Sequence, residues 1–257
     1  MILNKENAIK PEQLALWLQK PSTKRLLELE AGWLKHWVAQ FFGYHIAYTG
    51  IDPKPKFLRH SRVQHKFCLG LPWGRGVTAA EALIGDGEWP LPNNCLDVVI
   101  MQHSLDMSAH PHQLLRNASR CLVSGGYLVI VGFNPLSAWG LARWMHIFSP
   151  RMPWLTRPVS PARLQDWLVL LDMKIERQSA AAHFWPLSLG NEQLNKRIDR
   201  VLYDLRWLPA NAYVMVARKT TAGMTPIRQK RWALVQKPFT LPVAAASKAL
   251  HEMSKTE

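Results

Sequence analysis

Residues 97–131 decide the fold: Asp97-Val-Val-Ile-Met101, then Pro111-His-Gln-Leu-Leu-Arg-Asn-Ala-Ser-Arg-Cys-Leu122, then Gly125-Gly-Tyr-Leu-Val-Ile-Val131. The first and last pieces contain short β-branched runs next to turn residues, which is typical of buried strands. The middle piece predicts a helix with one apolar face formed by Leu114, Leu115, Ala118 and Leu122. A strand, a helix and a strand with short connections predict a parallel sheet covered by helices.

Two helices and a strand are expected before this unit. Apolar residues recur at helical spacing from Pro11 to Phe42, and Pro21-Ser22-Thr23 divides them, with Ser22 or Thr23 as N-cap of the second helix. Gly43 ends that helix. His45-Ile-Ala-Tyr-Thr49, followed by Gly50-Ile-Asp-Pro53, then predicts a buried strand that ends in a tight turn.

The remaining segments continue the alternation of strands and helices. A weaker strand is predicted at 62–69, a loop at 70–76, and helices from Asn134-Pro135 to about Phe148 and over 162–171. The second of these helices opens at Ser160-Pro161, with Pro at its favoured first position. Strands are predicted near 174–178 and at 212–217.

Composition and charge limit the class of protein. The chain has 257 residues, of which 48% are hydrophobic and 19% charged, so the whole chain is not intrinsically disordered. Its formal net charge of +14 favours polyanions such as nucleic acid or an acidic membrane surface. Cys68, Cys95 and Cys121 form no CxxC pair, so we expect neither a disulfide framework nor a metal site, and a reducing cytoplasm is the expected compartment.

No signal peptide and no membrane span are expected. Lys5, Glu6 and Lys10 precede any apolar run at the N-terminus. The stretch from Cys121 to Ala142 has no formal charge and about the length that spans a bilayer. Because Gly125-Gly126 and later Asn134-Pro135 interrupt it, we expect a buried strand instead.

The chain divides into three parts by its pattern. We expect a helical lead over residues 1–22, one domain over 23–219 and a basic, flexible tail over 220–257. The tail contains Arg228, Lys230, Arg231 and Trp232, which either contact RNA phosphate and bases or keep the tail soluble.

A family resemblance rests on residues 89–130. The segment Trp89-Pro-Leu-Pro-Asn-Asn-Cys-Leu-Asp-Val-Val-Ile-Met-Gln-His-Ser-Leu105, followed by His110-Pro-His-Gln-Leu-Leu-Arg-Asn-Ala-Ser-Arg-Cys-Leu-Val-Ser-Gly-Gly-Tyr-Leu-Val-Ile130, resembles the second half of a class I S-adenosylmethionine (SAM)-dependent methyltransferase. It is similar to the type 11 group, which includes the ubiquinone and menaquinone methyltransferases. Residues 132–141 also resemble a bacterial branch of that superfamily. The resemblance implies an α/β fold: a Rossmann-like three-layer sandwich whose sheet is mostly parallel, with the last strand antiparallel.

The same resemblance implies SAM as cofactor, bound at the carboxyl ends of the central strands where the strand order reverses. It places Asp86, with Gly87 beside it, at the adenine, and Gln102 and His103 near the sulfonium and the acceptor. The methionine moiety needs close backbone approach, which Gly50 would allow, and Asp52 would contact the ribose or the methionine amine.

The glycine-rich cofactor loop of the family is degenerate here, and two segments compete for its place. Leu27-Glu-Leu-Glu-Ala-Gly32 mimics that loop, with 46–52 then serving as the second strand. Alternatively, 45–50 is the first strand and Gly50-Ile-Asp52 is a reduced loop. An unbroken apolar helical stripe over 26–41 favours the second alternative. Either way a one-glycine loop would weaken cofactor binding.

Other side chains have two interpretations each. His103 is a weak candidate for a catalytic base or simply lines the pocket. Asp86 could instead cap its turn. His110 and His112 flank a proline, but without nearby carboxylate or cysteine we expect solvated loop residues. A further pair, Trp139 and Trp144, would floor an acceptor pocket or pack in the core.

The sequence therefore predicts SAM-dependent methyl transfer to a small-molecule or RNA acceptor. A sulfonium is already an activated leaving group, so alignment and exclusion of water are enough and no catalytic constellation is needed. The alternative is an eroded methyltransferase fold that binds RNA or protein. The enzyme interpretation requires an open crevice beside Gly50, Asp86 and Gln102, which bulky side chains such as Ile51 or Trp89 would block.

Overall fold

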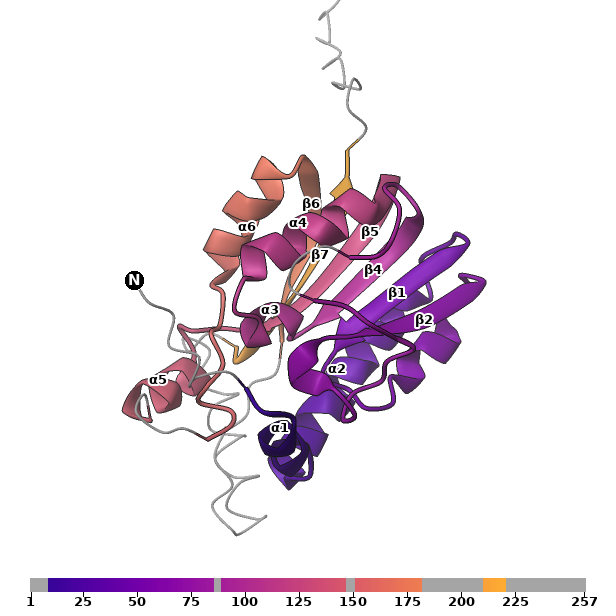
Figure 1. Ribbon diagram of the computed structural model, residues 1–257. Helices are drawn as coiled ribbons and strands as arrows, with labels where there is room; N and C mark the ends of the chain where they lie inside the picture. The colour runs from indigo at the N-terminus through magenta and orange to yellow at the C-terminus, as the bar shows by residue number, and fades with distance from the viewer. Residues whose placement is uncertain (1–8, 86–88, 147–150, 182–209, 221–257) are drawn as a thin grey trace, which may run out of the picture. The chain divides into compact units, whose positions relative to one another are not determined.

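A seven-stranded sheet forms the centre of the protein (Figure 1). The computed structural model describes residues 9–85, 89–146, 151–181 and 210–220. The strand order is β3-β2-β1-β4-β5-β7-β6. The strands are β1 (His45–Gly50), β2 (His65–Gly70), β3 (Ala82–Leu83), β4 (Leu96–Gln102), β5 (Leu122–Phe133), β6 (Met173–Ala181) and β7 (Ala212–Lys219).

The sheet has the mixed direction that the resemblance implies. Strands β3, β2, β1, β4 and β5 are parallel to one another. Strand β7 runs antiparallel to both β5 and β6, between which it lies. The predicted fold class is confirmed, and the uncharged stretch that begins at Cys121 contains the buried strand β5.

Helices fill the connections. They are α1 (Pro11–Leu18), α2 (Pro21–Val38), α3 (Ser104–Met107), α4 (Pro111–Cys121), α5 (Ala138–Met145) and α6 (Pro161–Leu170), with short 3-10 helices η2 (Lys56–His60) and η3 (Pro72–Gly74). Ser160 caps α6 by accepting a hydrogen bond from the Arg163 amide, as its position predicts. The predicted cap of α2 is wrong, because Pro21 itself occupies the first turn and Lys20 precedes the helix without a side-chain cap. Among these helices, none combines the length and apolarity needed to cross a membrane.

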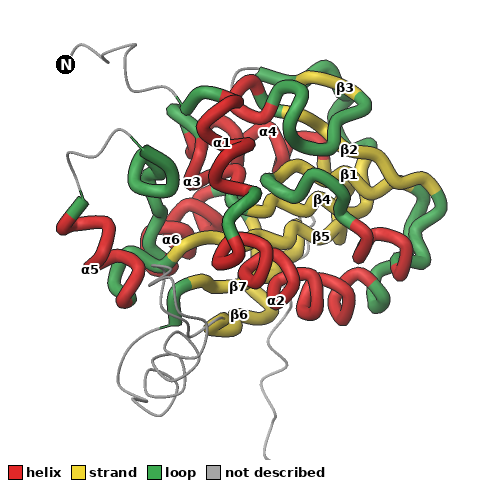
Figure 2. Tube along the Cα trace, turned by 90° about the horizontal axis from the view of Figure 1, so that it is seen from below, coloured by secondary structure: helices red, strands yellow, loops and turns green. Residues whose placement is uncertain are grey.

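The sheet buries a different set of side chains on each face, which makes three layers (Figure 2). Ala47, Val99 and Ile130 face one core, which also contains residues of α1, α4 and α6. Ile46, Val98 and Val129 face the other, which contains residues of α2 and η2. Because adjacent residues of each strand point to opposite faces, each strand contributes to both cores.

The two alternatives for the first strand are resolved by α2. Residues 27–32 are helical, and His45–Gly50 is the first strand, paired with β2 on one side and β4 on the other. The helix prevails because Leu26, Glu30, Leu34 and Val38 recur every four residues and are all buried. The prediction that residues 45–50 form the first strand is confirmed, while the role of Gly50-Ile-Asp52 as a reduced cofactor loop stays a prediction.

Two glycine substitutions test this assignment. A Cβ at Gly50 would lie 2.5 Å from Tyr48 Oη and 2.8 Å from the Gln102 carbonyl oxygen, whereas one at Gly32 meets nothing within 4 Å. We expect Gly50→Ala to lower the free energy of unfolding by about 1–3 kcal/mol through overpacking. Gly32→Ala, in an exposed helix interior, should raise it by about 0.5–1 kcal/mol. Urea denaturation measures both; destabilisation by Gly32→Ala would contradict the helical assignment.

Candidate functional site

The carboxyl ends of β1 and β4 form the candidate site. Gly50, the last residue of β1, pairs in register with Gln102, the last residue of β4. The chain leaves β1 toward β2 and reaches β4 on the other side, so the strand order reverses between these two ends. In open α/β sheets, ligands bind at such a switch point.

Three buried ionisable side chains meet at the end of β4. His103 Nε2 lies 2.7 Å from Glu30 Oε1, and His103 Nδ1 lies 2.9 Å from Asp106 Oδ2. All three side chains are at most 1% exposed. The His103 ring also stacks on Phe133 at a centroid distance of 3.9 Å. We call these residues the Glu30–His103–Asp106 cluster.

Hydrogen bonds extend from the cluster to the loop after β1. Gln102 Nε2 donates to Glu30 Oε2 at 2.6 Å, and Tyr48 Oη donates to Gln102 Oε1 at 2.8 Å. Tyr48 Oη in turn accepts from the Asp52 amide at 3.0 Å. This chain of contacts fixes the two strand ends and α2 relative to one another.

The surroundings hold His103 in its protonated form. Burial alone would lower the pKa of His103, but the charge of Glu30 and the hydrogen bonds to Asp106 and Glu30 outweigh it and raise the pKa to about 9. Burial raises the pKa of Asp106, opposed by its hydrogen bond with His103. At neutral pH both ring nitrogens of His103 are therefore donors, so in this arrangement the ring has no free nitrogen with which to take a proton.

Helix α1 lies across the ends of β1 and β4. It packs against η3, which follows β2. Its Trp17 ring meets the ring of Phe133, at the end of β5, edge-on at a centroid distance of 6.4 Å. Its eight residues form a helix about 12 Å long, and β2 and β5 are roughly 14 Å apart across the sheet, so the helix is long enough to reach from one to the other. Figure 1 shows α1 at the same end of the sheet as α3, which directly follows β4.

The expected open crevice is closed by this packing. Ile51 is 0% and Trp89 2% exposed, and both belong to the same core cluster as Leu14 and Trp17 of α1. We therefore expect that a ligand at this edge displaces α1.

The side chains beneath α1 nevertheless suit a polar ligand. Within the described residues, Thr49 Oγ1, Trp73 Nε1 and Trp89 Nε1 are buried and have no hydrogen-bond partner. Thr49 lies near the end of β1, and the two tryptophans follow β2 and β3. Unpaired buried donors are costly, and acceptors on a ligand such as SAM would satisfy them. The chemistry of this edge fits the cofactor that the resemblance implies.

The predicted site residues differ in their surroundings. Gly50, Gln102 and His103 are buried together, whereas Asp52 is partly exposed and its Oδ1 accepts from the Lys54 amide. Burial is the main cause that raises the pKa of Asp52, helped by the charge of Glu30. Asp86 and Gly87 lie outside the described residues, as does the basic tail from residue 221.

The tryptophan pair does not floor a pocket. Trp139 is 2% exposed and stacks on Phe133 at 4.3 Å, so it is a core residue, while Trp144 is 71% exposed. Over the described part of the chain, no group of three or more His, Cys, Asp or Glu side chains is arranged to hold a metal ion.

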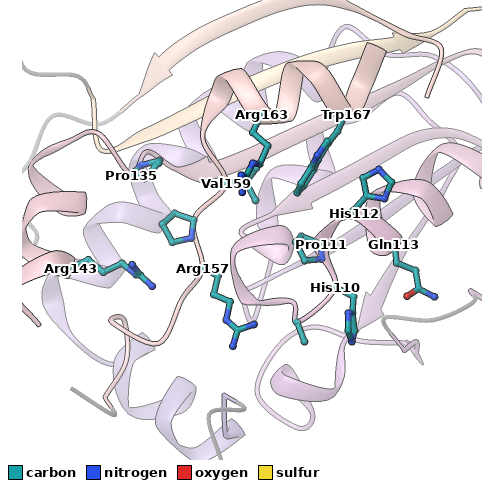
Figure 3. A pocket seen from close by; sticks show the side chains of 12 residues that line it. His110, Pro111, His112, Gln113, Pro135, Arg143, Arg157, Val159, Arg163 and Trp167 are labelled. Atoms are coloured by element: carbon teal, nitrogen blue, oxygen red, sulfur yellow. The ribbon is translucent and has the colours of Figure 1, made fainter. Parts of the chain in front are cut away.

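A concave region lies on the β4–β5 side of the candidate site (Figure 3). It is a pocket of about 720 Å³ lined from the turn before α4, the start of α4, α5, the segment before α6, and α6 itself. Its polar and aromatic lining is Arg143, Arg157, Arg163, His110, His112, Gln113 and Trp167. The two histidines are exposed, as expected, but they border a pocket.

Glu30 is the main site residue that the sequence analysis did not identify. It occupies a core position in the stripe Leu26–Glu30–Leu34 of α2. A charged residue on the apolar face of a helix is rarely buried without a partner. A glutamate within this apolar stripe is the sequence signal that would have identified Glu30.

The cluster makes stability depend on pH. The pKa of His103 in the folded protein, about 9, exceeds its ordinary value of 6.5. Protonation of His103 therefore contributes about 3 kcal/mol to the free energy of unfolding below pH 6.5, and this contribution is lost as the pH rises through 9. In the variant His103→Asn, asparagine can adopt the left-handed backbone of this position (φ +56°), and the contribution of the protonated histidine is removed. Relative to that variant, the native chain should lose stability between pH 6.5 and 10 in thermal melts. The exposed control His60→Asn should keep the native trend, and parallel curves for native chain and His103→Asn would refute the assignment.

Comparisons with known proteins agree with this architecture. Residues 29–130 match a family model described as a methyltransferase domain. The match begins inside α2 and ends in β5, so it includes all the strands that form the candidate site. The protein YafS of Escherichia coli (strain K12), described as uncharacterised, is 28% identical over 201 residues, which cover 77% of this chain and 78% of YafS.

Solved structures share the fold at low identity. A SAM-dependent methyltransferase from Thermotoga maritima superposes with a TM-score of 0.56 at 14% identity, covering 81% of this chain and 96% of that one. A chain from the complex between the Haloferax volcanii Trm112 methyltransferase activator and a methyltransferase gives 0.56 at 12% identity, covering 82% and 97%. The matched domain and the shared fold make this chain similar to SAM-dependent methyltransferases over residues 29–130 and in the architecture of its sheet.

Proposed function

We propose that the protein transfers the methyl group of SAM to an acceptor bound beside the carboxyl ends of β4 and β5. One observation carries the proposal: the residues that match a methyltransferase domain contain the strand ends of the candidate site. Three polar side chains without hydrogen-bond partners are buried there. When bound, SAM would supply a methyl group on a sulfonium, which needs no further activation.

The chain would hold the cofactor mainly through side chains that follow β1, β2 and β3. We assign the Asp52 carboxylate to the ribose hydroxyls or the methionine amine, because it is only partly buried and follows β1 directly. Asp86 and Gly87 keep their predicted place at the adenine. Thr49, Trp73 and Trp89 offer hydrogen bonds that no described residue takes up.

Gln102 and His103 act in this proposal as positioning residues. Their side chains are committed to Glu30 and Asp106, so they fix the end of β4 without reaching out to the acceptor. The proposal therefore includes no general base.

A second candidate function has one observation in its favour. The crevice is filled by Ile51 and covered by α1, and the loop that follows β1 has the single glycine Gly50 where the family has a glycine-rich loop. These features suit an eroded methyltransferase fold that serves as a binding module for RNA or protein. Cofactor binding discriminates between the two candidates.

Calorimetric titration with SAM and S-adenosylhomocysteine tests the proposal. The native chain should bind both. Asp52→Asn keeps the turn in which Oδ1 accepts from Lys54 but removes the charge, so it should weaken binding about tenfold, as expected for the loss of about 1.4 kcal/mol. The matched control is Asp172→Asn, at an exposed aspartate between α6 and β6 with a left-handed φ of +55°. This control should leave the affinity for SAM unchanged.

The titration has a clear negative outcome. No heat and no thermal shift at millimolar ligand would exclude the enzyme and leave the binding module. Because Gly32 is an exposed helical residue, Gly32→Ala should leave the affinity for SAM unchanged; a loss would return the cofactor loop to residues 27–32.

The closed crevice generates a separate expectation. If α1 must leave the strand ends for SAM to enter, saturating SAM should speed hydrogen exchange of the Pro11–Leu18 amides while slowing exchange around Thr49 and Asp52. Exchange measured by mass spectrometry, with α6 as internal reference, checks this. Slower exchange across α1 would instead mean that the helix tightens over the ligand, and our account of entry would fail.

A further inference from the structure

The pocket on the β4–β5 side carries an excess of positive charge. Arg143, Arg157 and Arg163 come from three segments and surround the same hollow, and no acidic residue lines it (Figure 3). Among the described residues, none of the three forms an ion pair with a carboxylate. Asp166, one turn further along α6 than Arg163, is outside the lining.

Partly buried Arg143 shows that no negative charge offsets the positive charges of the pocket. Arg143 Nε donates to the Thr156 carbonyl at 2.8 Å, which fixes the guanidinium in the wall. Burial lowers the pKa of Arg143, and the charge of Arg157 lowers it further. An anion in the pocket would relieve this repulsion, and guanidinium groups bind phosphate and carboxylate with matched geometry.

The start of α4 adds donors on the opposite wall. This helix of 11 residues begins at Pro111, and no side chain caps its N-terminus. Uncapped amides at a helix start, here at His112 and Gln113, favour negative charge. The arginine trio and the helix start are independent features that face one pocket.

The pocket is structurally tied to the candidate cofactor site. Asp106 of the Glu30–His103–Asp106 cluster accepts from the Phe133 and Val159 amides, and its carbonyl accepts from the Arg157 amide. The segment that carries Arg157 and Val159 is thereby fastened to the ends of β4 and β5. An acceptor in this pocket lies next to the strand ends at which the cofactor is proposed to bind.

The remaining lining describes the rest of the ligand. Pro135, Pro158, Val159 and the edge of Trp167 give the pocket apolar surface, and its volume is typical of a small-molecule site. We propose that the pocket binds the methyl acceptor as a small organic anion, whose phosphate or carboxylate groups contact Arg157 and Arg163 and whose apolar body lies against the prolines and Trp167. This inference rests on the proposed methyl transfer.

Titration with inorganic pyrophosphate and, separately, with citrate tests the anion site without the cofactor. Ionic strength is held constant with sodium chloride, so general screening does not change. Arg157→Gln and Arg163→Gln should each weaken binding at least tenfold. The matched control Arg59→Gln, at an exposed arginine of η2, should bind as the native chain does. The tighter of the two probes identifies phosphate or carboxylate as the preferred group.

The outcomes separate the two proposals. Absence of binding, or equal losses in Arg59→Gln, overturns the anion site and leaves SAM binding untouched. A short single-stranded RNA that binds more tightly than either probe and loses affinity in the same two variants overturns the small-molecule assignment. SAM binding is measured in all variants and should not change. Pyrophosphate binding without SAM binding would retain the pocket and remove the methyl transfer.

Discussion

The architecture of the candidate site depends on one buried ion cluster. Glu30 comes from α2, His103 from the turn after β4 and Asp106 from α3, and their contacts also fix Phe133 and Val159 through Asp106. Buried charges cost desolvation, and removing one partner of such a group leaves the others uncompensated. Loss of any one of the three side chains is therefore costly, and the cluster strongly specifies where α2 sits relative to the ends of β4 and β5.

Much of the fold was predictable because it rests on local patterns. The β-branched runs of β4 and β5, the apolar face of α4 and the Ser160 cap of α6 each determine their own structure without distant help. Short β3 lacks such a signal, since Ala82 and Leu83 are exposed and pair only with the end of β2. Its place in the sheet comes from tertiary pairing.

The candidate site was less predictable for a related reason. The resemblance pointed to Gln102 and His103 at the end of β4, but not to their burial, because the partner that buries them is 72 residues away in sequence. The arginine pocket was missed since Arg143, Arg157 and Arg163 follow no spacing rule. They meet only because α5, α6 and the segment between them line one pocket together with the start of α4.

Helix α1 links the N-terminal segment to the chemistry of the sheet. It places Leu14, Trp17 and Leu18 against the strand ends where a cofactor would bind, so helix and cofactor compete for one surface. Thermodynamic coupling between two such occupants is reciprocal. A partner protein that bound the released apolar face of α1 would therefore raise the affinity for the cofactor. The cofactor would raise the affinity for that partner by the same factor, so the N-terminal segment would allow a second protein to activate this one.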